Sequence, residues 1–563
     1  MEKQVIVLIV TIVAIIAFVF IKGFFDTKRN LKNFRFMLKN SFGQPVDKKY
    51  EPTQYQNISK YHQKNRGEYD VDDITWNDLA MDSVYMQMNS TYSSAGEEYL
   101  YHLLRSPLTT KEKRAELESM IQYFTEHEDA RVELQIAFSR IGKTGKYSLY
   151  DYLDFLDDLG ERKNEKHLYG IFAYISGIVA LFLNPFVGMV FLIGTMCYSL
   201  ISYTGEKSEI EPYYTSLLYV LRIVKGIETI KKADADVIKP QVETLNEKKK
   251  AFSKFLRKGK WLERGDIGSD PLSVVYLYLK MMLHLDLMVF NTMLREVRKH
   301  NKDINDIVTI MGRIEASIAI ASYRASLEHY CIPQFDTGNV LKIENAYHPL
   351  ISEPVKNSIT ANKGVLLTGS NASGKSTFLK TVAINVILAQ CINTCLADEY
   401  SAPIYRIYSS MALKDDLYSG ESYYIVEIKA LKRIMDAMND DNEVPVLCFV
   451  DEVLRGTNTV ERIAASTQIM KSLIGNHVKC FAATHDIELT HLLENDYENY
   501  HFEEEVIDDD VVFNYLLKTG RATTRNAIKL LSVMGYDEAI IDNANAMAAA
   551  FIEKGHWVSN VER

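Results

Sequence analysis

The chain has 563 residues, of which 47% are hydrophobic and 25% are charged, so it is long enough for several globular domains with buried cores. This composition excludes a chain that is disordered throughout. The formal net charge of −10 excludes a uniformly basic nucleic-acid coat protein, although local basic patches are compatible with it. Of the six cysteines, only Cys391 and Cys395 lie close together, without a second pair or nearby histidines. We therefore expect reduced thiols and no structural zinc.

The N-terminal segment is the first predicted membrane span. Residues 5–21 carry no charge, and Thr11 is their only polar residue. The long apolar core and the lack of a small-residue cleavage site do not fit a cleaved signal peptide. The basic residues that follow, from Lys22 to Arg35, place the C-terminal side of the span in the cytoplasm. We therefore expect an uncleaved anchor over residues 1–25 with its N-terminus outside.

A second apolar stretch predicts a membrane hairpin. Residues 168–203 are broken by Asn184-Pro185 and have the length of two short helices. Basic residues precede the stretch and Lys207 follows it, as expected for a hairpin that returns to the cytoplasm. A soluble helical hairpin buried in protein is the alternative. The chain is thus predicted to have three transmembrane helices, a multi-pass location in the cell membrane and cytoplasmic C-terminal domains.

The remaining sequence predicts a helical part followed by an α/β part. Residues 72–160 and 206–332 show apolar residues at three- and four-residue spacing among charged ones, which is typical of amphipathic helices. After Pro333, short β-like runs such as 340–343 introduce an α/β pattern that lasts to about residue 515. The expected fold is an α-helical core and lever domain plus an α/β domain.

One loop in the α/β part has the pattern of a phosphate-binding loop. The β-like run 364–367, the loop Gly369-Ser-Asn-Ala-Ser-Gly-Lys-Ser376 and a helix-like segment follow one another. In such a loop, backbone N–H groups surround the β- and γ-phosphates, Lys375 neutralises them and Ser376 reaches Mg²⁺. ATP and Mg²⁺ are therefore the expected cofactors. The predicted nucleotide-binding residues are Gly369, Ser370, Asn371, Ala372, Ser373, Gly374, Lys375, Ser376 and Thr377.

Two later segments supply the groups that hydrolysis needs. An apolar run ends in Asp451-Glu452, where Asp451 would hold Mg²⁺ together with Ser376 and Glu452 would polarise the attacking water. A second apolar run ends in His485, at the strand edge where ligands lie in parallel sheets. Glu452, His485 and Lys375 are the predicted catalytic residues. A helix cap for the carboxylates and a structural role for the histidine are the alternatives.

Several stretches of the chain resemble the MutS family of DNA mismatch-repair ATPases. Four of them match the motifs of the family's ATPase, two resemble the start and the last helix of its helical core, and one resembles its dimerising helix–turn–helix. In that order, the stretches are 368–377, 416–422, 451–457, 483–485, 93–108, 312–321 and 518–548.

The resemblance implies an ABC-type ATPase that works as a homodimer through its ATPase domains. A signature loop would reach the γ-phosphate bound by the other protomer, and a second loop would lie beside Glu452 across the dimer interface. Closing such an interface completes the electrostatics of the transition state. The implied signature loop comprises Ser419, Gly420 and Ser422, and the implied cross-dimer loop comprises Arg455, Gly456 and Thr457.

The chain also departs from the family. An anchor and a linker stand where a mismatch-reading domain and a connector domain are expected, and the predicted hairpin occupies the place of the DNA-touching clamp. Ser370 and Ala372 replace the usual Pro and Met of the phosphate loop. The predicted domains are an anchor (1–25), a linker (26–71), the first part of the core (72–160), the hairpin (161–205), the lever and second part of the core (206–332), the ATPase domain (333–517) and the dimerising segment (518–563).

Two functions agree with these features. The first is a membrane-anchored, dimeric ATP-hydrolysing switch, for which the family implies binding of mismatched or otherwise unusual DNA. The second is a membrane ATPase that moves or senses a bilayer component or a partner protein, without a nucleic-acid role. A basic run from Lys248 to Arg264 with interleaved aromatic residues fits nucleic-acid phosphates, the anionic inner leaflet or the exposed side of a lever helix. DNA and membrane lipid are therefore both candidate partners.

Overall fold

The chain divides into two compact units in the computed structural model. The helical unit comprises Met1–Asn65, Gln87–His102 and Glu116–Ser326, and the sheet-containing unit comprises Arg66–Met86, Leu103–Ala115 and Leu327–Arg563. The structure describes residues 2–46, 50–145, 147–263, 278–370, 373–411, 423–438, 442–454, 457–475, 477–507, 510–522, 528, 531, 534–554 and 557.

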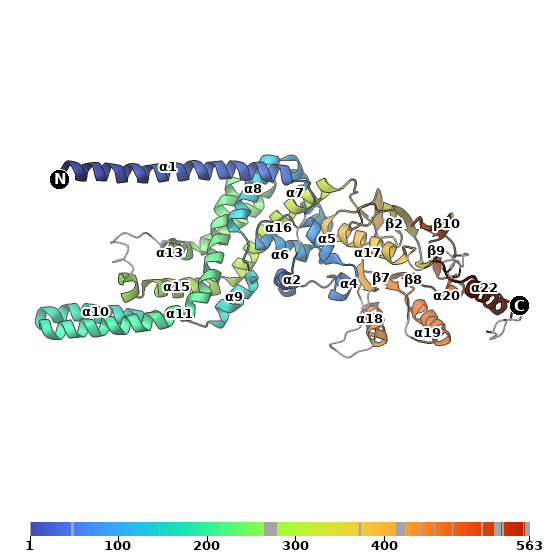
Figure 1. Ribbon diagram of the computed structural model, residues 1–563. Helices are drawn as coiled ribbons and strands as arrows, with labels where there is room; N and C mark the ends of the chain where they lie inside the picture. Colours follow the sequence, from blue (N-terminus) through green and yellow to red (C-terminus); the bar gives the residue numbers. More distant parts are fainter. Residues whose placement is uncertain are drawn as a thin grey trace. The chain divides into compact units, whose positions relative to one another are not determined.

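Helices make up the described part of the helical unit, as the sequence predicts (Figure 1). Two of these helices, α6 and α7, also include residues that belong to the sheet-containing unit. The helices are α1 (Glu2–Ser41), α2 (Pro52–Ile58), α3 (Lys60–Lys64), α6 (Ser94–Leu103), α7 (Lys111–Glu126), α8 (Glu128–Ile141), α9 (Leu149–Asp158), α10 (Glu165–Leu183), α11 (Pro185–Lys232), the 3₁₀ helix η1 (Asp236–Ile238), α12 (Lys239–Ala251), α13 (Ser253–Glu263), α15 (Leu285–Lys299) and α16 (Asn301–Ser326).

The core of the helical unit is built where α6 crosses α16. A Cβ atom on Gly312 of α16 would lie 2.4 Å from the Tyr99 Cβ and 2.6 Å from the Ala95 carbonyl oxygen, so only glycine permits this approach. One turn later, the buried Glu315 carboxyl accepts hydrogen bonds from the backbone N–H groups of Tyr92 and Ser93 at 2.5 and 3.1 Å. These bonds satisfy the backbone N–H groups directly before α6, which have no hydrogen-bond acceptor within the helix. The two stretches that resemble the family's first and last core helices are therefore packed against each other.

Helices α10 and α11 form an antiparallel hairpin (Figure 1). Asn184 begins α11 because its side-chain oxygen accepts from the N–H groups of Phe186 and Val187, and Pro185 fills the first helical position. Gly188 lets the two helices touch, since a Cβ there would lie 2.4 Å from the Leu181 nitrogen. Both helices are long and apolar enough to cross a membrane.

The third predicted span lies at the start of α1, but the side chains of most of residues 1–20 lie outside the described residues. The described residues thus contain two candidate membrane spans, both in the hairpin.

A mostly parallel sheet forms the centre of the second unit. Its six strands run in the order β12-β9-β4-β8-β7-β6, and only β12 is antiparallel to its neighbour. A four-stranded sheet, β1-β5-β2-β3, and the hairpin β10-β11 complete the strands. The strands are β1 (Gln334–Phe335), β2 (Leu341–Ala346), β3 (Asn357–Ala361), β4 (Gly364–Thr368), β5 (Glu399–Ala402), β6 (Arg406–Ser410), β7 (Val446–Asp451), β8 (Val478–Ala483), β9 (Tyr497–His501), β10 (Glu504–Ile507), β11 (Asp510–Phe513) and β12 (Lys518–Thr519).

Helices pack on this sheet and fix its core. Cys448 in β7 lies opposite Cys480 in β8, and both are free thiols that are fully buried. At the edge strand β6, Ser409 donates to Asp78 at 2.6 Å and to Thr75 through its N–H at 3.0 Å. The helices of this unit are α4 (Asp73–Asp78), α5 (Met81–Met88), α17 (Lys375–Ile392), α18 (Tyr423–Met438), α19 (Thr459–Ser472), α20 (Ile487–Leu492) and α22 (Glu538–Lys554).

Candidate nucleotide-binding site

A cavity of about 550 Å³ lies at the carboxyl ends of β4 and β7. The sequence-predicted residues that line it are Ser373, Gly374, Lys375, Ser376, Thr377, Asp451, Glu452 and His485. They come from three separate stretches of the chain, which meet because β4, β8 and β7 are neighbours and run parallel. In parallel α/β sheets, ligands bind outside these strand ends.

The loop between β4 and α17 has the backbone that phosphate binding requires. Gly369 has φ +143° and Gly374 has φ +105°, conformations that residues with a Cβ rarely adopt. A Cβ on Gly369 would also lie 2.5 Å from the Phe502 carbonyl oxygen. The buried Lys375 ammonium donates to the carbonyl oxygens of Gly369 and Ser370 at 2.9 and 2.7 Å. The lysine is therefore held over the loop, with the N-terminus of α17 behind it.

The acidic pair and the histidine lie on adjacent strand ends. Asp451 ends β7 opposite Ala483 of β8, and the Glu452 N–H donates to the Ala483 carbonyl at 2.9 Å. Glu452 has φ +59°, a strained conformation that turns its side chain out of the strand direction. Its Oε1 lies 3.0 Å from Nε2 of His485. Both side chains line the same cavity as Lys375, so the predicted catalytic residues are brought together.

Neighbouring side chains hold the turn after Glu452. The buried Glu427 of α18 accepts from the Leu454 N–H, and Ser466 of α19 donates to the Val453 carbonyl at 3.0 Å. Beside His485, Asp486 accepts two hydrogen bonds from Arg462 at 2.6 and 2.9 Å, and these raise the pKa of that guanidinium. The Glu452 carboxylate thus lies on a turn that is held by side chains from both flanking helices.

One residue of the predicted cross-dimer loop lies just before α19. Thr457 is described, and its hydroxyl lies 3.3 Å from the Glu461 carboxylate at the start of α19. The residues Asn371, Ala372, Ser419, Gly420, Ser422, Arg455 and Gly456 lie outside the described residues.

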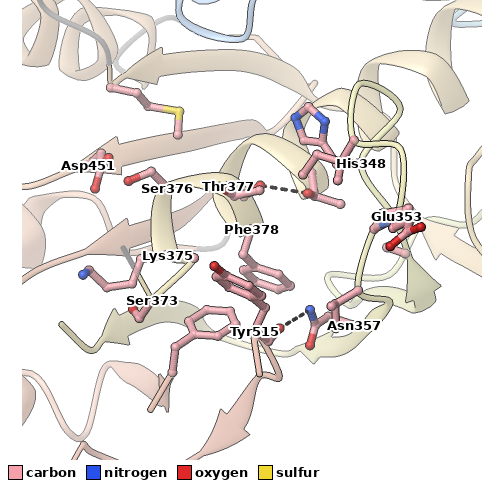
Figure 2. Close-up of a pocket in the computed structure, with 18 of the residues that line it drawn as sticks. His348, Glu353, Asn357, Ser373, Lys375, Ser376, Thr377, Phe378, Asp451 and Tyr515 are labelled. Atoms are coloured by element: carbon pink, nitrogen blue, oxygen red, sulfur yellow. Dashed lines mark hydrogen bonds between the residues drawn. The ribbon is translucent and has the colours of Figure 1, made fainter. Parts of the chain in front are cut away.

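The cavity also has a wall that the motifs do not reveal. Phe378, Asn357, Tyr515, Glu353 and His348 all line it (Figure 2). The Asn357 amide donates to the Tyr515 carbonyl at 3.0 Å, which holds the segment after β11 against the start of β3. Phe378 lies in α17 and Asn357 begins β3, whereas the other three lie outside the helices and strands. His348 and Asn357 stand in stretches, 347–350 and 355–357, that resemble the family's approach to the phosphate loop, but nothing local in the sequence marks Glu353 and Tyr515.

Comparisons with known proteins agree with this site. The family model of MutS domain V matches residues 365–552, which include every described residue of the phosphate loop, the acidic pair and His485. This matched part of the chain belongs to the MutS family.

Curated members of the MutS family align with about half of the chain. DNA mismatch repair protein MutS of Thermus thermophilus is 27% identical over 268 residues, which are 46% of this chain and 32% of that protein. The proteins of the same name from Natronomonas pharaonis and Fusobacterium nucleatum are 29% and 28% identical over 272 and 292 residues, covering 31% and 32% of their lengths. The chain therefore spans about a third of the length of these MutS relatives.

Ser370, which stands where the MutS family usually has proline, forms a side-chain hydrogen bond. Its hydroxyl donates to Oε2 of Glu504 in β10 at 2.8 Å, and Glu504 is buried. A proline at this position could not make that bond, so Ser370 ties the predicted phosphate loop to the β10–β11 hairpin.

His348 is expected to make the stability of the folded protein depend on pH. Burial, and then the charge of Lys380, lower the pKa of His348 to about 4. Its Nδ1 accepts from the Leu350 N–H at 3.2 Å, which needs the neutral ring. Since the unfolded chain takes up this proton near pH 6.5, the stabilisation is complete above that pH and is lost as the pH falls towards 4.

We therefore expect His348→Gln to remove part of the acid sensitivity of the protein. Between pH 7 and pH 4, wild type should lose on the order of 3 kcal/mol more of its free energy of unfolding than the variant. Urea unfolding of both proteins at the two pH values measures the difference. Equal losses in the two proteins would show that His348 does not titrate in this way.

Proposed function

We propose that this protein is an ATPase that binds and hydrolyses Mg²⁺-ATP as a homodimer and acts as a nucleotide-driven switch. The observation that carries the proposal is the meeting of Lys375, Glu452 and His485 in one cavity at the strand ends. Membership of the MutS family supports it, because the matched region is that family's ATPase domain.

The described residues suit each part of that chemistry. Lys375 is placed to neutralise phosphate charge beside the N-terminus of α17. Ser376 and Asp451, which both line the cavity, offer the hydroxyl and carboxylate oxygens that Mg²⁺ prefers (Figure 2). Mg²⁺ held there would offset the charge that develops on the phosphates. Glu452 would orient the attacking water, and His485 would hold that carboxylate or the γ-phosphate.

We further propose that the hairpin α10–α11 lies in the cell membrane and that the ATPase unit faces the cytoplasm. The apolar side chains near the turn point into solvent, with Phe182, Leu183 and Phe186 exposed by 87%, 83% and 77%. In each of the two helices, only 17% of the most apolar stretch is buried within the protein. The 19 residues of α10 span about 28 Å, which is close to the thickness of a bilayer core. A bilayer would cover surface that is otherwise costly to expose.

Cys197, an exposed thiol in the hairpin, permits a direct test. In sealed vesicles that expose the cytoplasmic face, with Cys331 replaced by serine, Cys197 should resist a water-soluble maleimide until detergent is added. Ser119→Cys, a nearly isosteric change at an exposed position of α7, should react at once and serves as the matched control. Rapid labelling of Cys197 in intact vesicles would contradict the membrane location.

The ligand beyond ATP has two candidates. Unusual or mismatched DNA is the one that the family implies. In the basic run that could contact it, Lys248 pairs with Asp303 and Asp306 at 3.2 and 2.6 Å and Lys249 pairs with Glu228. Four further basic residues of the run are exposed: Lys250, Lys254, Arg257 and Lys258. Two of the aromatic residues within the run, Phe252 and Phe255, are fully buried. The exposed apolar hairpin α10–α11 favours the second candidate, a bilayer component or partner protein without a nucleic-acid role.

A binding titration separates the two candidates. Full-length protein in detergent is mixed with mismatched duplex and branched DNA at low and at moderate salt, with and without ATP. Salt-dependent binding that stimulates ATP turnover would support the DNA role. Absence of both binding and stimulation at low salt would favour the membrane or partner role.

A further inference from the structure

Two buried histidines meet where the membrane hairpin joins the lever helices. His167 lies in the first turn of α10 and is 2% exposed, and His284 lies directly before α15 and is 7% exposed. Their Nδ1 atoms are 2.9 Å apart. Glu206 of α11 completes the group, with its Oε2 atom 3.6 Å from Nε2 of His167. None of the three residues belongs to the nucleotide cavity.

The surroundings of His284 fix which ring nitrogen carries a lone pair. Its Nε2 lies 2.9 Å from the carbonyl oxygen of Ser199, which can only accept, so Nε2 carries the hydrogen. In the neutral ring, Nδ1 is then unprotonated and faces His167. Metal-binding histidines are oriented in the same way, by donating their other ring N–H to a carbonyl or carboxylate. His284 also has φ +50°, an uncommon backbone conformation that places its ring in this position.

Glu206 is oriented in a comparable way. Its Oε1 atom accepts from the Ser202 hydroxyl at 3.2 Å and pairs with the Lys166 ammonium at 2.9 Å. Those two partners occupy one oxygen, and Oε2 lies beside Nε2 of His167, where the Asn291 amide also lies at 3.4 Å. An ion bound by the two Nδ1 atoms therefore requires Oε2 to move from Nε2 towards Nδ1 of His167.

The distances within the group suit a small metal ion. One ring nitrogen of each histidine and one oxygen of Glu206 all lie within 4.8 Å of one another. In a tetrahedral zinc site with Zn–N distances of 2.0–2.1 Å, two nitrogen ligands are about 3.3 Å apart. The observed 2.9 Å between the two Nδ1 atoms needs to widen by only a few tenths of an ångström. Imidazole and carboxylate ligands together favour Zn²⁺ among the common divalent ions.

We propose that His167, Glu206 and His284 form a site for a divalent transition-metal ion, with Zn²⁺ the best fit, at the base of the hairpin. The three ligands come from α10, α11 and the start of α15, so the ion would fasten both hairpin helices to the lever. Three protein ligands leave one position for water. This site departs from the expectation of no structural zinc, which rested on the spacing of the cysteines.

Zinc titration of the full-length protein tests the site. Protein in detergent is stripped with a chelator, freed of nucleotide and Mg²⁺, and titrated with Zn²⁺ against a chromophoric indicator. We expect one equivalent bound per chain and a higher unfolding temperature with zinc. His284→Asn keeps a residue that tolerates positive φ but removes the imidazole, so it should weaken zinc binding by at least about tenfold. His491→Asn, at an exposed position, should bind zinc as wild type does.

Two further measurements keep the proposal open to refutation if His284→Asn fails to fold. Glu206→Gln, which preserves the shape of the side chain, should also weaken zinc binding. X-ray absorption of zinc-loaded wild type should show imidazole ligands at 2.0–2.1 Å. Zinc uptake that is absent in wild type, unchanged in both ligand variants, or without imidazole ligation would overturn the proposal and leave a hydrogen-bonded histidine pair.

Discussion

Glu452→Gln is expected to abolish ATP turnover while ATP binding and ATP-bound dimers persist. The amide keeps the size of the side chain and leaves Lys375, Ser376 and Asp451 unchanged, so the phosphate and metal ligands remain. It cannot accept a proton from the attacking water, however, and general-base catalysis contributes about 10²–10⁴-fold to such reactions. A turnover number at least about a hundredfold lower, with nucleotide affinity close to that of wild type, is therefore the expected result.

Phosphate release and size-exclusion chromatography in Mg²⁺-ATP measure the two halves of this prediction. Glu488→Gln is the matched control, because Glu488 is an exposed glutamate three residues after His485 and does not line the cavity. It should hydrolyse ATP as wild type does. Unchanged hydrolysis in Glu452→Gln would refute the assignment of Glu452 as the catalytic carboxylate.

Gly369→Ala is expected to weaken nucleotide binding at least about tenfold. A Cβ at φ +143° is strained, by about 1–3 kcal/mol for conformations of this kind, and tenfold corresponds to about 1.4 kcal/mol. The added atom would also lie 2.5 Å from the Phe502 carbonyl oxygen, which belongs to the backbone and cannot swing away. The loop must therefore shift, and the carbonyl groups that hold Lys375 shift with it.

Gly475→Ala is the control for this substitution in the same unit. Its Cβ would meet only the Val478 side chain at 3.7 Å, an ordinary contact. Fluorescent-nucleotide titration of both variants gives the affinities, and circular dichroism reports whether they are folded. Equal affinities for Gly369→Ala and wild type would show that the loop conformation does not limit binding.

Much of the nucleotide cavity could be predicted from the sequence. A strand, a glycine-rich loop and a helix dictate one local geometry, and the ends of neighbouring parallel strands must meet at one edge. The order of these segments along the chain is therefore sufficient to place Lys375, Asp451 and His485 in one site. The contact between Glu452 and His485 also depends on β7 and β8 being neighbours, which the motifs imply only through the family's fold.

Other features depend on contacts between distant parts of the chain. The bond from Ser370 to Glu504 joins residues 134 positions apart, and nothing in either segment indicates it. The group at His167, Glu206 and His284 is likewise dispersed, so no metal-binding spacing appears in the sequence. The basic run from Lys248 has an ambiguous pattern, and only the carboxylates opposite it show that its first lysines face protein.

ATP turnover by the full-length protein at known oligomeric state tests the central claim most directly. Protein in detergent is separated into monomer and dimer fractions, and phosphate release is followed in each with and without Mg²⁺. The proposed function predicts Mg²⁺-dependent release that belongs to the dimer and disappears in Glu452→Gln. Absence of Mg²⁺-dependent release, or an equal rate per chain in a stable monomer fraction, would contradict it.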